Sequence, residues 1–340
     1  MAGISRRTVL SLAAGTGFLR AQISSYQSRA SVSLVRGDDR RKNVYNALLA
    51  IDDQIRPALK RKKYVLLKPN TVTATNQLGS THADAIRGIL DYLSERYRGP
   101  VVIADSSKDC TWDAYENFHY NRVLTEYRSL KVSLVDFNED PHPVVHEIVD
   151  RDLHLTQVRL ASRLFDPDAY VLGCALLKAH DNVVATLSVK NLVMSAPLHT
   201  ARNGSGKWSD KARYHQGYRQ IQMNIALTAK RMRPFWGATV IDGFEGMEGE
   251  GPLRGTAVAS RLAIASTDCV AADRVGVECM GVNPVWPGYL QYCCDSGLGQ
   301  YDLGRIDLRG AVGLAEVRKI YKLHPKVDKQ MEWLGPLVTG

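Results

Sequence analysis

Residues 178–192, KAHDNVVATLSVKNL, carry polar side chains that could do chemistry within an otherwise apolar stretch. Lys178 and His180 precede a run of β-branched and small residues, and Lys190 and Asn191 follow it. A lysine in such surroundings is costly to desolvate unless an opposite charge compensates it. Lysine offers a point charge to a phosphate or carboxylate, and histidine titrates near neutral pH. The stretch therefore predicts an anion site in which His180 and Lys190 are catalytic, with His180 as the general acid/base.

Charged groups beside small or turn-forming residues also end other predicted strands, at Lys68-Pro69-Asn70, Asp105-Ser106-Ser107 and Asp242-Gly243. Parallel sheets place ligands at the carboxyl ends of their strands. We therefore expect the ligand to be bound by Lys68, Asn70, Lys178, Asn191 and His82. Two alternatives stay open. The lysines could form structural ion pairs with Asp181, Asp242 or Asp273, and His82 could cap a helix at the surface.

The stretch DGFEGMEGEGP, residues 242–252, holds four carboxylates among four glycines. Crowded carboxylates repel one another unless a cation joins them, and Mg²⁺ and Ca²⁺ prefer oxygen ligands. If a divalent metal is bound, Asp242 and Glu248 are the expected ligands. The spacing is not that of an EF-hand, and an acidic turn facing solvent is the alternative.

Alternating strands and helices must position these groups. Continuous apolar runs predict strands, and helical spacing of apolar residues predicts helices between or after them. This order indicates an α/β fold with a mostly parallel sheet covered by helices on both faces, as one domain or as two lobes with a cleft between them. We place this domain at residues 30–310, a C-terminal extension at 311–340, and a long loop, either a lid or a surface excursion, at 201–218. The predicted strands are 30–35, 64–67, 101–105, 131–137, 169–177 and 238–241, and the main predicted helices are 83–97, 117–127, 218–231 and 269–280.

Several cofactor and catalytic motifs are absent from the sequence. No G-x-G-x-x-G follows a predicted strand, and there is neither a Walker phosphate loop nor a G-x-S-x-G elbow. The six cysteines form no CxxC, so an iron–sulfur cluster motif is excluded. The adjacent Cys293 and Cys294 are not expected to bridge each other, because neighbouring residues rarely meet disulfide geometry. The sequence names no cofactor beyond the candidate divalent metal.

The N-terminal residues predict export. Ser5-Arg6-Arg7 precedes a short apolar run rich in glycine and alanine, which resembles a twin-arginine signal peptide over residues 1–21 with cleavage after Ala21. No later stretch reaches the roughly 20 apolar residues of a membrane helix. We therefore expect a soluble periplasmic or extracellular protein that engages the twin-arginine translocation machinery. The net charge of +9 lies partly in basic runs without interleaved aromatics, so no nucleic-acid partner is expected.

A set of short blocks resembles domain-of-unknown-function family 362 over most of the predicted mature chain. The chain departs from the family pattern in carrying Cys269 where proline is usual and Ser195 where glycine is common, and it lacks the ferredoxin-like module of some relatives. The resemblance implies an α/β fold and brings no established reaction. The blocks are Lys68-Pro69-Asn70, Thr81-His82, Lys178-x-His180, Lys190-Asn191-Leu192, Asp242-Gly243, Met247-Glu248-Gly249-x-Gly251-Pro252 and Asp268 to Asp273.

A fainter similarity runs to the nickel-pincer lactate racemases. In that family a histidine is followed ten residues later by a lysine before a proline, and His180, Lys190 and Pro197 reproduce this order. The glycine-rich turn before the racemase lysine is missing, because Thr186 to Val189 stands in its place. The similarity is one of architecture, which does not carry function by itself.

Three functions are compatible with the sequence. The first is an exported enzyme that acts on a small anionic metabolite in a lysine, histidine and carboxylate cleft. The second is a protein that binds an anion or cofactor without turning it over, in which His180 is dispensable. The third, a nucleic-acid or polymer binder, would show steep salt dependence and has no recognised module here.

Overall fold

The computed structural model describes residues 28–335. A ten-stranded sheet runs through the chain in the order β12-β1-β11-β9-β7-β2-β3-β4, with β8 paired to β7 and β10 paired to β9. The strands of this sheet are β1 (Ala30–Arg36), β2 (Tyr64–Lys68), β3 (Val101–Asp105), β4 (Val132–Asp136), β7 (Ala169–His180), β8 (Val184–Thr186), β9 (Trp236–Glu248), β10 (Thr256–Val258), β11 (Leu262–Ser266) and β12 (Ile306–Arg309).

Five neighbouring strands, β9, β7, β2, β3 and β4, are parallel to one another. β11 pairs with β9 and with β1 in the antiparallel sense. The prediction of a mostly parallel α/β sheet is therefore confirmed. One continuous sheet holds the fold together, and two lobes are not confirmed.

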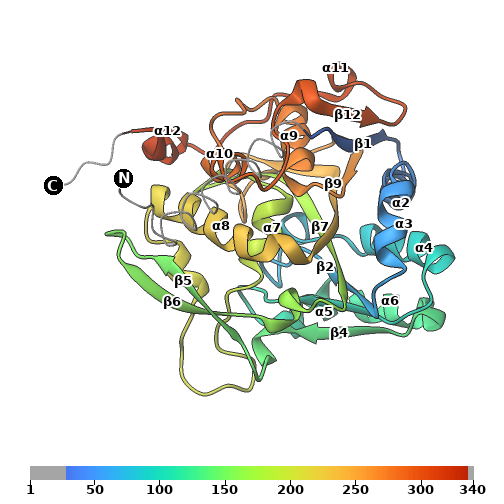
Figure 1. Cartoon of the computed structure of the whole chain (residues 1–340), viewed down its shortest axis with the longest axis horizontal. Helices are drawn as coiled ribbons and strands as arrows, with labels where there is room; N and C mark the ends of the chain where they lie inside the picture. The colour runs from blue at the N-terminus through green and yellow to red at the C-terminus, as the bar shows by residue number, and fades with distance from the viewer. Residues whose placement is uncertain (1–27, 336–340) are drawn as a thin grey trace, which may run out of the picture.

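Helices cover both faces of the sheet (Figure 1). β7 shows the division, because Val171 and Ala175 pack into one core while the intervening Leu172 and Cys174 pack into the other. The first core includes side chains of α7 (Ser188–Met194), α8 (Tyr218–Met232), α9 (Cys269–Cys279) and α10 (Gly288–Asp295). The second includes side chains of α2 (Arg40–Leu49), α3 (Asp52–Leu59), α4 (Ala83–Arg96), α5 (Thr111–Asn117) and α6 (Tyr120–Glu126).

A separate hairpin of β5 (Val144–Val149) and β6 (Leu155–Leu160) lies beside α8 (Figure 1). Asn224 of α8 joins the two elements, since its side-chain amide accepts a hydrogen bond from the Val149 amide and donates one to the Val149 carbonyl. The hairpin is therefore attached to α8 and is not a part of the main sheet.

Several predicted boundaries need correction. β7 and β9 run longer than expected, so Lys178, His180 and Asp242 lie inside strands rather than after them. The helix predicted over 117–127 is replaced by α5 and α6, which His119 separates with a φ of 63°. A left-handed residue at that position cannot continue a helix.

Residues 311–335 are part of the packed structure. They form the short helices α11 (Leu314–Val317) and α12 (Val327–Gln330). The buried Gln330 side chain accepts a hydrogen bond from the Val184 amide and donates one of 3.0 Å to the His180 carbonyl. The segment predicted as an extension therefore braces the turn between β7 and β8.

Cys110, Cys174, Cys269, Cys279 and Cys293 are free cysteines, so Cys293 forms no bridge to its neighbour Cys294. Within residues 28–335, the helices are too short or too polar to cross a membrane. The predicted signal peptide, residues 1–21, lies outside the described residues.

Candidate anion-binding site

A cavity of about 670 Å³ opens at the carboxyl ends of β2 and β3. Residues from β7, β8, α7, the loop over 199–215 and the Pro252-Leu253 turn complete its wall. Two aspartates, Asp105 and Asp181, line it. They face six lysines, namely Lys68, Lys108, Lys178, Lys190, Lys207 and Lys211. The wall therefore carries a formal excess of positive charge.

Lys68 has a carboxylate partner in this cavity. Its Nζ lies 3.3 Å from Oδ1 of Asp105 and donates to the Asn191 carbonyl at 2.9 Å and to Asn191 Oδ1 at 2.6 Å. Asp105 in turn accepts hydrogen bonds from the backbone and hydroxyl of Thr71. Burial lowers the pKa of Lys68, and the Asp105 carboxylate opposes that shift. Lys68 is thus an integral part of a buried polar network.

Lys178 joins the same network through an amide. It donates to Asn70 Oδ1 at 2.6 Å and to the Gly79 carbonyl at 2.9 Å, while Asn70 Nδ2 donates to Asn191 Oδ1 at 2.8 Å. Both acceptors of Lys178 are neutral oxygens. Burial lowers the pKa of Lys178 well below its usual value, and the neighbouring Lys190 and Lys68 add to the shift. A bound anion would supply the charge that these partners lack.

Lys190 faces His180 across the cavity wall. Lys190 Nζ lies 2.9 Å from Nε2 of His180, and both side chains are buried. Burial lowers the pKa of Lys190 to about 8, against an opposing effect of Asp181. Burial, with the charge of Lys190, also holds the pKa of His180 well below its usual value, so the imidazole is neutral near pH 7. The neutral imidazole of His180 and the amino group of Lys190 therefore form a hydrogen-bonded pair that could exchange a proton.

Lys211 lies on a short 3-10 turn of the 199–215 loop. Its Nζ donates to the carbonyl and the hydroxyl of Ser106, and burial lowers its pKa to about 8. Among the described residues, neither Lys211 nor Lys178 nor Lys190 forms an ion pair with a carboxylate. Two buried polar atoms of the cavity residues, Asn191 Nδ2 and Thr186 Oγ1, also have no hydrogen-bond partner in the described part of the chain.

A family model described as "Domain of unknown function (DUF362)" matches residues 65–278. This range contains the described residues that line the cavity. The chain belongs to the DUF362 family.

Comparison with individual proteins adds one relative and two solved structures. "Thylakoid-associated protein sll1697" of Synechocystis sp. is 26% identical over 227 residues, which are 65% of this chain and 64% of the relative. A crystal structure of a Thermotoga maritima protein covers 77% of this chain and 60% of its own, at 9% identity and a TM-score of 0.46. Loganic acid methyltransferase with SAH covers 82% and 70%, at 11% identity and a TM-score of 0.26. At these scores the two structures carry no argument about function.

The block from Asp268 to Asp273 of this DUF362 chain has a structural role. Asp268 caps α9 by accepting hydrogen bonds from the amides of Val270 and Ala271. Asp273, five residues later in α9, accepts hydrogen bonds from the amides of Ser188 and Val189 at the start of α7. α7 is thereby fixed so that Lys190 and Asn191 line the cavity. Asp273 is not the ion-pair partner of a lysine, which was one open alternative.

Three predicted site residues lie outside the cavity of this DUF362 protein. His82 is the N-cap of α4, where its Nδ1 accepts the Asp84 amide at 3.1 Å. Asp242 is buried within β9 and pairs with Arg40 at 3.2 Å. Glu248 accepts the Lys322 amide at 2.8 Å. The glycine-rich stretch contributes Pro252 to the wall instead of its carboxylates. The structure therefore does not bring Asp242 and Glu248 to the lysines, and their metal binding stays a prediction.

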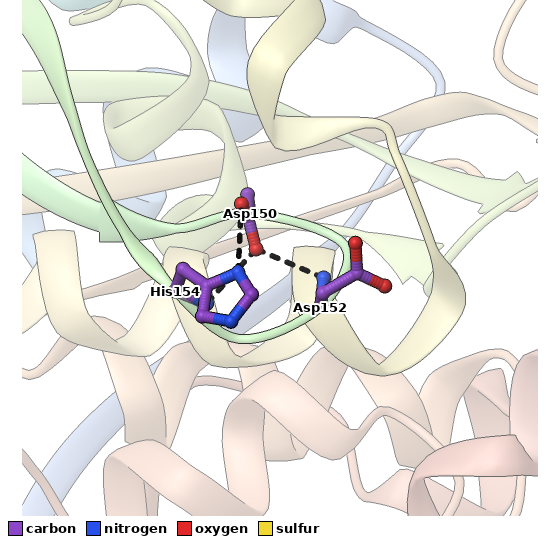
Figure 2. Close-up of side chains that lie close together, drawn as sticks. All are labelled: Asp150, Asp152 and His154. Atoms are coloured by element: carbon purple, nitrogen blue, oxygen red, sulfur yellow. Dashed lines mark hydrogen bonds and ion pairs between the residues drawn. The ribbon is translucent and has the colours of Figure 1, made fainter. Parts of the chain in front are cut away.

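Another acidic group lies on the turn between β5 and β6 (Figure 2). Asp150, Asp152 and His154 each offer a ligand atom, and these atoms lie within 4.8 Å of one another. Asp150 Oδ1 accepts the backbone amides of Asp152 and His154, as a turn-forming aspartate commonly does. These hydrogen bonds fold residues 150–154 into a turn, which explains why the three side chains lie close together.

Sequence reasoning missed Lys211, Trp208 and Thr186 as cavity residues. The basic and aromatic composition of the 201–218 loop was the available signal for the first two. Thr186 gave none, because a threonine in an apolar run is equally typical of a buried strand.

Proposed function

We propose that this protein binds a small anionic metabolite in the cavity and acts on it as an enzyme. The observation that carries the proposal is the charge of the wall. Among residues 28–335, six lysines and two aspartates line it, and the buried Lys178 and Lys190 form no ion pair with a carboxylate. Buried cations are normally paired, so an unpaired group of them is best explained by a ligand of opposite charge. The volume of about 670 Å³ suits a small molecule.

The geometry supports a different role for each polar group. Lys178 and Lys211 would hold the anionic part of the ligand, since their present partners are neutral oxygens. Lys68 would hold Asn191 in place through its hydrogen bonds to the backbone carbonyl and side-chain oxygen of Asn191. His180 and Lys190 would transfer protons at the reacting atoms, because they form a hydrogen-bonded pair in the same wall.

Calorimetric titration of the purified protein with sulfate, phosphate and glycolate tests the proposal. We expect at least one of these anions to bind, and Lys178→Met to weaken its binding by about tenfold or more, or about 1.4 kcal/mol. Lys60→Met, which removes an exposed lysine that does not line the cavity, is the matched control and should bind as wild type does. Equal binding by Lys178→Met and wild type would contradict the proposal.

A non-catalytic binding protein is the alternative that the same cavity allows. His180→Ala separates the two functions. An enzyme should lose turnover of whichever metabolite copurifies with the protein, as identified by native mass spectrometry. A binding protein should keep that metabolite at full affinity and show no turnover in either form.

We also propose that the protein is exported by the twin-arginine route. The support is the Ser5-Arg6-Arg7 motif and the apolar run after it. The expected consequence of replacing both arginines is given among the predictions below.

A further inference from the structure

The two ring nitrogens of His180 have different partners. The backbone amide of Asn182 donates a hydrogen bond of 3.0 Å to Nδ1. A neutral imidazole carries one hydrogen, and a nitrogen that accepts a hydrogen bond cannot hold it. With the Asn182 amide as the partner of Nδ1, the hydrogen of His180 sits on Nε2, which faces Lys190 Nζ at 2.9 Å. The carboxylate oxygen Oδ1 of Asp181, 3.0 Å from the same Nδ1, favours the other tautomer, in which Nε2 accepts a hydrogen bond from Lys190. In the tautomer with the hydrogen on Nε2, His180 donates to the unprotonated form of Lys190, whose lone pair is then held beside the imidazole.

Burial and the neighbouring lysines make Lys190 easier to deprotonate than an ordinary lysine. Burial comes first among the causes that lower the pKa of Lys190, and the nearby Lys211 and Lys68 act in the same direction. Asp181 opposes them from the exposed end of the turn, where its Oδ1 lies 3.0 Å from Nδ1 of His180. With a pKa of about 8, Lys190 has a far larger unprotonated fraction near neutral pH than an ordinary lysine.

We propose that Lys190 is a nucleophile that forms an imine with its ligand, and that the ligand is a small anion bearing an aldehyde or ketone group. This inference rests on the proposed anion-binding function. A desolvated lysine beside other cationic groups is a common source of a nucleophilic amine. The carbonyl compound should be anionic because further lysines line the cavity around Lys190.

The step balances without an oxidant or a reductant. The Lys190 lone pair attacks the carbonyl carbon, the C=O π pair moves to oxygen, and a proton passes from nitrogen to that oxygen. The resulting carbinolamine loses the oxygen as water, and C=N replaces C=O. His180 can carry the proton, because its Nε2 is hydrogen-bonded to the reacting nitrogen. Hydrolysis reverses the sequence and restores the amine.

The cavity also holds groups that could receive the carbonyl oxygen. Asn191 Nδ2 and Thr186 Oγ1 are buried donors without partners among the described residues, and both residues line the cavity with Lys190. A buried donor without a partner is destabilising, and an oxygen of the ligand would satisfy it. Their presence beside an amine favours a ligand with a hydrogen-bond acceptor at its reacting carbon.

Reductive trapping tests the inference on the full chain. The protein is incubated with glyoxylate and sodium cyanoborohydride, and the adduct is located by peptide mass mapping. We expect Lys190 to gain the mass of glyoxylate less one oxygen atom. Lys190→Met should lose this adduct and His180→Ala should form it at least about tenfold more slowly, whereas Lys60→Met should match wild type. Glycolate has the same charge and nearly the same size, but a hydroxymethyl group replaces the aldehyde. It should therefore compete for the cavity and form no adduct.

The possible failures are distinguishable. If glycolate binds but glyoxylate gives no adduct at Lys190, or labels exposed lysines equally fast, the nucleophile is overturned and the anion cavity stands. If neither compound nor any inorganic anion binds, both proposals fall. An adduct formed equally fast by His180→Ala would overturn the proton-transfer role of the pair.

Discussion

Lys68 Nζ lies 3.3 Å from Oδ1 of Asp105, with both side chains buried, whereas Lys190, in the same cavity, has the imidazole of His180 as its hydrogen-bond partner within residues 28–335. The same residue type thus occupies two electrostatic environments within one wall. Replacing each lysine should therefore have opposite effects on stability.

Lys68→Met should destabilise the fold by about 3–5 kcal/mol, because it leaves the buried Asp105 carboxylate without its cation. Adding Asp105→Asn should recover part of this loss, since the remaining amide needs no counter-charge. Urea unfolding of the two single variants and the double variant measures the coupling. Strictly additive losses would show that the pair does not interact.

Lys190→Met should leave the melting temperature unchanged or raise it, because methionine fills the same space without a polar group to desolvate. The same variant should lose about tenfold or more in affinity for the anion that wild type binds. Thermal unfolding and calorimetry on the same sample check both halves. A loss of more than about 2 kcal/mol in unfolding free energy would mean that Lys190 is a structural residue.

Stability should depend on pH through Asp273. Burial raises the pKa of this carboxyl to about 7, above its value of about 3.9 in an unfolded chain. The folded state therefore binds more protons between these values, and the contribution of Asp273 to stability falls as pH rises from about 4 to 7. In Asp273→Asn this part of the dependence should disappear. Urea unfolding at several pH values would contradict the assignment if both proteins gave parallel profiles.

Gln330→Ala should loosen the turn that carries His180. Loss of the Gln330 amide group leaves the Val184 amide and the His180 carbonyl without their side-chain partner, which should lower the unfolding free energy by about 1–3 kcal/mol. Amide hydrogen exchange at Val184 should accelerate, and trapping of glyoxylate at Lys190 should slow. Lys329→Ala, at the exposed neighbouring position, is the control. Unchanged exchange in Gln330→Ala would show that the brace is dispensable.

Replacing Arg6 and Arg7 together by lysine should keep the precursor in the cytoplasm. The reason is that the twin-arginine route reads the arginine pair, while the charge of the N-terminal region is unchanged by lysine. Fractionation with immunoblotting gives the distribution. Wild-type levels of the exported form would refute this route.

The sequence was informative where local chemistry and topology agree. The parallel strands and the polar residues at their ends, such as Lys68 and Asn70, followed from strand patterning and from the rule that ligands bind at the carboxyl edge. Lys178, His180 and Lys190 share the cavity because β7 extends to His180 and α7 returns beside it.

The sequence was uninformative where a partner comes from a distant segment. Asp242 was expected to face the lysines, but it forms its ion pair with Arg40 of α2, at 3.2 Å. His82 is equally suited to a helix cap and to a ligand site, and the Asp84 amide decides for the cap. Such pairings depend on which elements pack together, and spacing along the chain does not encode them.

The start of α7 is already occupied, since the amides of Ser188 and Val189 are bound to Asp273. A helix N-terminus that binds an anion selects it by fixed N–H directions. In this cavity the anion would instead be bound by lysine side chains, which act as rotatable point charges. The cavity should therefore rank carboxylates, sulfates and phosphates by how easily each sheds its hydration, with little regard to whether the anion is planar or tetrahedral.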